Sequence, residues 1–81
     1  MSVYAWLLIQ TEVGRARGVA DAVAAIAYPG VRVLQSDTVT GPHDVIAHFV
    51  AEDVDILGDV TASILAAIGG VQKVVTSVKL D

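Results

Sequence analysis

The sequence predicts an α+β domain whose strands and helices follow one another in the order βαββαβ. Two stretches indicate this most directly, because residues 25–33 and 67–74 each pass from an Ala-rich helical pattern through glycine into a Val-rich strand. The same junction occurring twice in 81 residues indicates two similar halves that share one sheet. A chain of this length makes one domain, here residues 1–81, with one modest hydrophobic core.

The first half of the chain begins with a strand and continues with a helix. Residues 3–11 form a continuous run of mainly apolar and aromatic side chains, which is typical of a strand buried on both faces. Gly14 ends this run, and residues 15–27 then place apolar side chains at the spacing of an amphipathic helix. Pro29 and Gly30 end the helix, since proline cannot continue it and glycine tolerates the turn.

The remaining elements follow the same scheme after a hairpin. Residues 31–40 are more polar than the first strand, which is typical of an edge strand, and residues 44–51 return antiparallel to them. Residues 52–68 predict a second helix, whose acidic start suits the positive end of the helix dipole. Residues 71–80 alternate apolar and polar side chains and form the last strand. This order, with a four-stranded antiparallel sheet, is that of ferredoxin-like folds.

Two helices cover only one face of a four-stranded sheet, so the other face needs a second layer. Side chains alternate along a strand, which puts Tyr4, Trp6 and Leu8 on one face and their neighbours on the other. An exposed sheet face that carried these side chains would be a large apolar patch. We therefore expect an obligate homodimer whose sheets pack face to face as a dimeric α+β barrel.

The composition fits a self-associating protein and argues against several other classes. Apolar residues make up 54% of the chain and charged residues 17%, which leaves little polar surface for so small a protein on its own. The net charge of −4 and the lack of a basic stripe argue against direct binding to nucleic acid. The sequence has no cysteine, no apolar run that approaches a membrane span, and no basic signal-peptide start, so we expect a cytoplasmic protein.

The best candidate site is the turn from Thr40 to Asp44, with Gly41, Pro42 and His43 between them. A hairpin tip presents backbone amides and one carboxylate on a rigid scaffold. Asp44 can accept hydrogen bonds from an ammonium group while the loop amides hold a carboxylate, and this combination suits a zwitterionic amino acid. The simpler interpretation is that Gly-Pro and Asp are ordinary turn residues.

The same turn carries a resemblance to a known family. Residues 39–47, Val-Thr-Gly-Pro-His-Asp-Val-Ile-Ala, resemble the TG-x-x-D-hydrophobic signature of the effector-binding domain of Lrp/AsnC regulators, also called the RAM domain. Residues 4–11, the Gly14-Arg15-Ala16 turn, and the Pro29-Gly30-Val31 and Gly70-Val71 junctions are similar to the same family. The resemblance covers nearly the whole chain. It implies a ferredoxin-like fold, face-to-face dimers, and rings of dimers with small effectors, typically amino acids, bound in clefts between them.

Carried over to this sequence, the resemblance implies a ligand site formed by the loop and the last strand. Its residues are Thr40, Gly41, Pro42, His43, Asp44, Thr76 and Ser77. His43 stands where family loops often carry an aromatic residue. Typical members begin with a helix-turn-helix domain that binds DNA, whereas this sequence starts at the first strand of the effector domain. We therefore expect a stand-alone sensor of an amino-acid-like molecule, a homodimer or higher oligomer that reaches DNA only through a partner such as a full-length Lrp/AsnC regulator.

Three other functions are compatible with the sequence. A dimeric α+β barrel enzyme, such as a small cofactor-free monooxygenase, would use His48 or Trp6 in a roomy pocket between helices and sheet. The amino-acid-binding ACT module has the same element order and would hold its ligand near Gly14. A structural adaptor would bind no ligand. We favour the sensor and expect no enzymatic activity, no cofactor and no metal, because no catalytic constellation accompanies His48 and the acidic residues fit no calcium loop.

Overall fold

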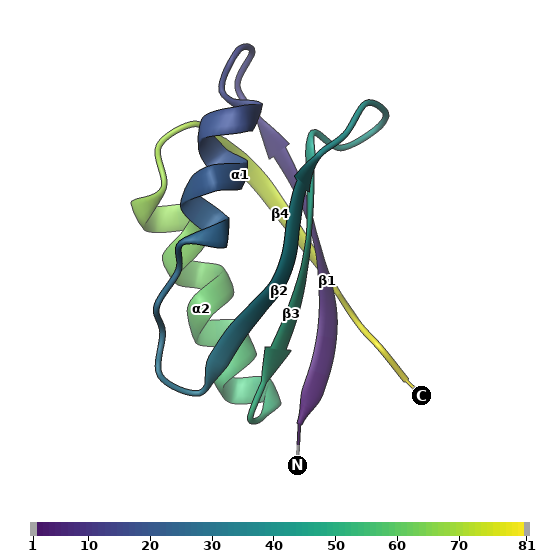
Figure 1. Ribbon diagram of the computed structural model, residues 1–81, viewed down its shortest axis with the longest axis vertical. Coiled ribbons are helices and arrows are strands. Elements are labelled where there is room, and N and C mark those ends of the chain that lie inside the picture. Colours follow the sequence, from purple (N-terminus) through teal and green to yellow (C-terminus); the bar gives the residue numbers. More distant parts are fainter. Residues whose placement is uncertain (1, 81) are drawn as a thin grey trace.

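The secondary structure follows the predicted order. The computed structural model describes residues 2–80, and Figure 1 shows two helices against one side of a sheet. In chain order the elements are β1 (Val3–Thr11), α1 (Ala16–Ala24), β2 (Val31–Thr38), β3 (Val45–Ala51), α2 (Val54–Ala67) and β4 (Val71–Val78). The strands lie in the order β2-β3-β1-β4, and each neighbouring pair is antiparallel. The ferredoxin-like α+β prediction is confirmed, with β2 at an edge as its polarity indicated.

The core lies between the sheet and the two helices. On β1 the side chains of Ala5, Leu7 and Ile9 are fully buried, and every second residue of β3 from Val45 to Ala51 is buried as well. The helices complete the layer with the buried side chains of Val19, Ala20, Val23, Leu57, Val60 and Ile64. Within residues 2–80 no polar or charged residue is buried, so the burial of apolar surface is the main force that holds helices to sheet.

The other side of the sheet is not covered by a helix. We call it the open face; it carries the alternate side chains of the strands, which include Tyr4, Trp6, Leu8, Ile46, His48, Val50, Val75 and Ser77. Tyr4 and Trp6 are 42% and 41% exposed, large values for aromatic residues on an inner strand. The side-chain alternation predicted for this strand is confirmed, and an apolar surface remains available to a second layer.

Helix α1 ends earlier than the sequence pattern predicts. The prediction extended the helix to residue 27, but its last residue is Ala24. Two hydrogen bonds turn the chain instead. The amide of Ile26 donates to the carbonyl of Val23 (3.2 Å), and the amide of Val31 donates to the carbonyl of Tyr28 (3.0 Å). Tyr28 precedes a proline, which disfavours helical backbone at that position. Ile26 and Tyr28 also pack against the core from this connector, a contact that a continued helix would rearrange.

The acidic start of α2 acts as the sequence indicated. Asp53 is the N-cap, and its side chain accepts a hydrogen bond of 2.8 Å from the amide of Ile56. Asp55 follows in the first turn, at the positive end of the helix dipole. Strands β2 and β4 end two residues earlier than predicted, and β3 begins one residue later.

The repeated glycine junctions make equivalent contacts in the two halves of the chain. Gly30 and Gly70 precede β2 and β4 with φ angles of +82° and +94°. Their carbonyls accept hydrogen bonds of 2.9 and 2.8 Å from the amides of Glu52 and Glu12, which directly follow β3 and β1. A Cβ atom added to Gly30 would come within 3.1 Å of the Glu52 side chain, and one added to Gly70 within 2.9 Å of Arg15. Both junctions therefore favour glycine for their backbone, and Gly70 needs it also for the close approach of Arg15.

Candidate functional site

The predicted site lies in the loop that joins β2 to β3. This loop, residues 39–44, projects beyond the strands at one end of the sheet (Figure 1). The amide of Asp44 donates to the carbonyl of Ile9 (2.9 Å), and a carboxylate oxygen of Asp44 accepts from the amide of Thr11 (2.8 Å). The carbonyl of Asp44 accepts from the amide of Val39 (2.9 Å) and closes the base of the loop. Asp44 therefore fixes the loop to the end of β1.

Two further residues shape the tip of this loop. The side-chain amide of Gln10 donates a hydrogen bond of 3.2 Å to the carbonyl of Pro42. Gly41 has a φ angle of +145°, a conformation that L-residues rarely adopt. A Cβ atom added there would meet no atom within 4 Å. The backbone conformation, and not a close neighbour, therefore favours glycine at position 41.

The loop leaves polar groups free to bind a ligand. Within residues 2–80, the amides of Gly41 and His43 donate no hydrogen bond, and the second carboxylate oxygen of Asp44 accepts none. Thr40, Gly41 and Pro42 are exposed, whereas His43 and Asp44 are half-buried. Two amide donors thus stand on the same fixed loop as one carboxylate. A molecule with both a carboxylate and an ammonium group can find a partner for each charge there.

The two predicted site residues on β4 lie on opposite faces of the sheet. Thr76 pairs with Leu7, and its hydroxyl oxygen is 3.5 Å from that of Thr61 on α2. Ser77 pairs with Trp6 and is exposed on the open face. The 39–44 loop is bonded to the last residues of β1, beyond both of these pairs. Within one protomer, the structure therefore brings neither hydroxyl to the loop.

Comparison with known proteins identifies the family. The family model of the Lrp/AsnC ligand binding domain matches residues 4–81. This chain belongs to the Lrp/AsnC ligand-binding domain family. No curated protein sequence matches it significantly.

Solved structures share the fold of this Lrp/AsnC domain. TTHA0845 from Thermus thermophilus is 26% identical and superposes with a TM-score of 0.84 over 98% of this chain and 94% of that one. The hypothetical protein PHS023 from Pyrococcus horikoshii is 22% identical, with a TM-score of 0.81 over 96% of this chain and 89% of that one. The transcriptional regulator NMB0573 from Neisseria meningitidis, solved as a complex with L-Met, is 21% identical. Its TM-score is 0.75, over 98% of this chain and 50% of the regulator.

Sequence reasoning did not assign Gln10 and Thr11 to the site of this Lrp/AsnC domain. They are the positions at which the apolar run of β1 becomes polar, and they lie opposite Lys73 and Val71 of β4. A polar pair at the end of an inner strand is a usable signal, because a neighbouring loop must satisfy or share its hydrogen-bonding groups. These two residues hold the loop that carries the predicted ligand contacts.

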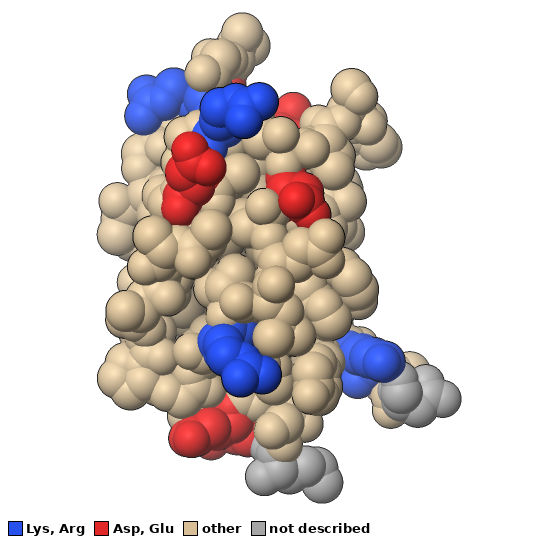
Figure 2. Space-filling model, in the orientation of Figure 1, with Lys and Arg blue, Asp and Glu red and all other residues tan. Residues whose placement is uncertain are grey.

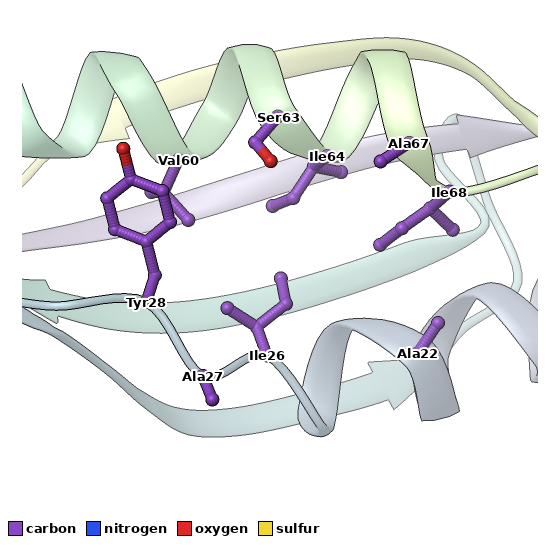
Figure 3. Close-up of a pocket in the computed structure, with 9 residues that line it drawn as sticks. All are labelled: Ala22, Ile26, Ala27, Tyr28, Val60, Ser63, Ile64, Ala67 and Ile68. Atoms are coloured by element: carbon purple, nitrogen blue, oxygen red, sulfur yellow. The ribbon is translucent and has the colours of Figure 1, made fainter.

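A cavity of about 220 Å³ lies between α2 and the connector after α1 (Figure 3). Apart from the side chains of Tyr28 and Ser63 its walls are apolar, and it is lined by Ala22, Ile26, Ala27, Tyr28, Val60, Ser63, Ile64, Ala67 and Ile68. The enzyme hypothesis predicted a pocket between helices and sheet that contains His48 or Trp6. Both of these side chains lie on the open face, on the opposite side of the sheet, so neither lines this cavity.

Charged residues form no metal site in the described part of the chain, and the side shown in Figure 2 has no basic stripe. Among residues 2–80, no group of three or more His, Asp or Glu side chains could hold a metal ion. On the side shown in Figure 2, Lys and Arg gather at the upper end and recur separately lower down, with Asp and Glu between them. No helix in residues 2–80 is long and apolar enough to cross a membrane. The turn between β1 and α1, where the ACT alternative would hold its ligand, lies at the same end of the molecule as the 39–44 loop (Figure 1).

Proposed function

We propose that this effector-binding domain senses an amino-acid-like molecule at residues 40–44 and self-associates through its open face. Its membership of the Lrp/AsnC ligand-binding family supports the role of a small effector. One observation carries the location of the site. Asp44 uses one carboxylate oxygen to fix the loop to Thr11 and keeps the other oxygen unbonded within residues 2–80, beside the free amides of Gly41 and His43.

A second copy of the chain is the partner that the open face fits best. Its centre is aromatic and apolar, around Tyr4 and Trp6. Its rim carries charges of both signs, because Arg32 and Asp37 lie on the open face of β2 and Lys73 on that of β4. An apolar, aromatic centre with a polar rim is the usual anatomy of a protein interface. A symmetric pair can set the acidic part of one rim against a basic part of the other.

The mechanism we propose is linkage between ligand binding and assembly. An effector held by the 40–44 loop of one dimer and contacted by a neighbouring dimer would favour the assembled ring. The effector can change the free energy of assembly only by the difference between its binding free energies for the assembled and the separated states. Ser77 is exposed on the open face and can reach such a ligand only from a neighbouring subunit, whereas Thr76 is turned towards α2.

We infer a regulatory and not a catalytic role. The family is defined by ligand binding, and a structurally similar protein is a transcriptional regulator solved with L-Met. Co-assembly with a longer family member that has a DNA-binding domain would connect ligand binding to transcription. Pull-down of the full chain with such a regulator, in the presence and absence of the effector, tests this partner.

Isothermal titration of the twenty amino acids into the protein tests the proposed ligand class. Asp44→Asn keeps an oxygen that can accept from Thr11 but removes the charge, so it should weaken binding about tenfold to a hundredfold, the loss expected for one charged hydrogen bond. Asp21→Asn, which changes an exposed carboxylate on α1, is the matched control and should bind as the unchanged chain does. Equal affinities for the two variants would remove Asp44 from the site, and no heat with any amino acid would refute the ligand class.

A further inference from the structure

His48 occupies the centre of the open face in an unusual state. Its ring stacks on that of Trp6, with centroids 4.0 Å apart and planes inclined by 4°, and the Tyr4 ring lies at 6.0 Å. The Nε2 atom of His48 is buried and has no hydrogen-bond partner within residues 2–80. A buried polar atom without a partner is rare in native proteins and calls for an explanation.

The surroundings of His48 on the open face are poor in negative charge. Trp6 of β1 and Gln35 of β2 pair with it directly, and neither is charged. Within residues 2–80, the titratable and charged residues that strand pairing places on this face are Tyr4, Arg32, Asp37 and Lys73, and Lys79 lies over the Tyr4 ring. The one carboxylate among them, Asp37, pairs with Ile46 and not with His48. A proton on His48 therefore adds positive charge to a face that already has an excess of it.

We propose that His48 makes self-association through the open face dependent on pH, so that the neutral imidazole is compatible with the interface and the protonated one opposes it. This inference rests on the proposed dimer. A second sheet over the open face would further remove His48 from water, and its Nε2 has no acceptor at hand for an added proton. Stacking on Trp6 attracts an imidazolium, but the stack is already present in the single protomer and so does not favour the dimer.

The direction of the effect follows from the positive charge that histidine gains as the pH falls. Histidine is the side chain that changes charge between pH 5 and 8, so association is strong at the upper end of this range and is weakened towards its lower end. If the interface admits only the neutral form, each His48 weakens association about tenfold between pH 7.5 and pH 5.5. A symmetric dimer contains two such residues, and its Kd should therefore rise about a hundredfold.

Sedimentation equilibrium of the full chain at pH 7.5, 6.5 and 5.5, at constant ionic strength, tests the inference. His48→Phe keeps an aromatic ring on Trp6 but cannot gain a proton, and Asp21→Asn, which changes an exposed carboxylate on α1, is the control outside the open face. We expect a Kd that rises about a hundredfold in the unchanged chain and in Asp21→Asn and that stays nearly constant in His48→Phe. His48→Gln serves as a second uncharged variant, and far-UV circular dichroism establishes that each variant is folded.

Three outcomes would overturn the inference, and they distinguish the role of His48 from the proposed dimer. A protein that is dimeric at pH 7.5 and keeps the same Kd at pH 5.5 would refute the role of His48 and leave the proposed dimer intact. The same holds if His48→Phe and His48→Gln lose affinity at low pH as steeply as the unchanged chain. A monomer at micromolar concentration at pH 7.5 would instead refute the proposed dimer itself, and the inference with it.

Discussion

Replacing Gly70 with alanine tests the contact that joins the two halves of the fold. Alanine in left-handed backbone costs about 1–2 kcal/mol, and Gly70 has a φ angle of +94°. The new Cβ atom would also lie 2.9 Å from the Cβ atom of Arg15, closer than real Cβ atoms approach one another. Overpacking of this kind costs about 1–3 kcal/mol. Gly70→Ala should therefore lower the free energy of unfolding by about 2–5 kcal/mol.

Gly14→Ala separates the two contributions. Gly14 has a similar φ angle of +81°, but a Cβ atom there would meet nothing within 4 Å. It should therefore cost only the backbone part, about 1–2 kcal/mol. Urea unfolding followed by circular dichroism, at one fixed protein concentration because self-association adds stability, measures both variants. Equal losses for Gly14→Ala and Gly70→Ala would show that Arg15 does not restrict position 70.

Two further predictions concern the start of α2 and the open face. Asp53→Ala removes the N-cap hydrogen bond to the amide of Ile56 and should lower the free energy of unfolding by about 1 kcal/mol, whereas Asp55→Ala should cost less than about 0.5 kcal/mol; thermal unfolding of both variants checks this. Ser77→Asp puts a charge opposite Trp6 and should weaken self-association at least about tenfold in sedimentation experiments, whereas Thr76→Val, on the helix side of the same strand, should leave the Kd unchanged. Equal effects of the two β4 variants would exclude the open face as the interface.

The order of the elements and the uncovered face were predictable because both depend on local periodicity. Alternation along β1 alone separates Trp6 from Leu7, and the structure gives them 41% and 0% exposure. The repeated Gly-Val junctions likewise predicted two halves that share a sheet. The end of α1 was wrong because the apolar spacing continues to residue 27, while Pro29 and the packing of Ile26 favour a turned connector.

The contacts of the site depend on partners far apart in the sequence and were not predictable from it. Asp44 bonds to Thr11, 33 residues away, and this pair exists only in the register that aligns Ile9 with Val45. The loop sequence could therefore indicate a carboxylate but not which of its oxygens remains free. The placement of Thr76 and Ser77 on opposite faces, in contrast, was predictable from the sequence, because neighbouring residues of a strand face opposite ways.

The geometry of β1 connects the ligand loop to the open face through a short path. Gln10 follows Trp6 and Leu8 on the open side of this strand, and its side chain holds the carbonyl of Pro42 in the loop. A sheet packed on this strand would therefore restrict the same residue that positions the loop. Coupling between binding sites is reciprocal, so an effector that strengthens assembly must itself bind more tightly to the assembled protein. Protonation of His48, which opposes assembly in our proposal, should then weaken effector binding although His48 lies outside the loop.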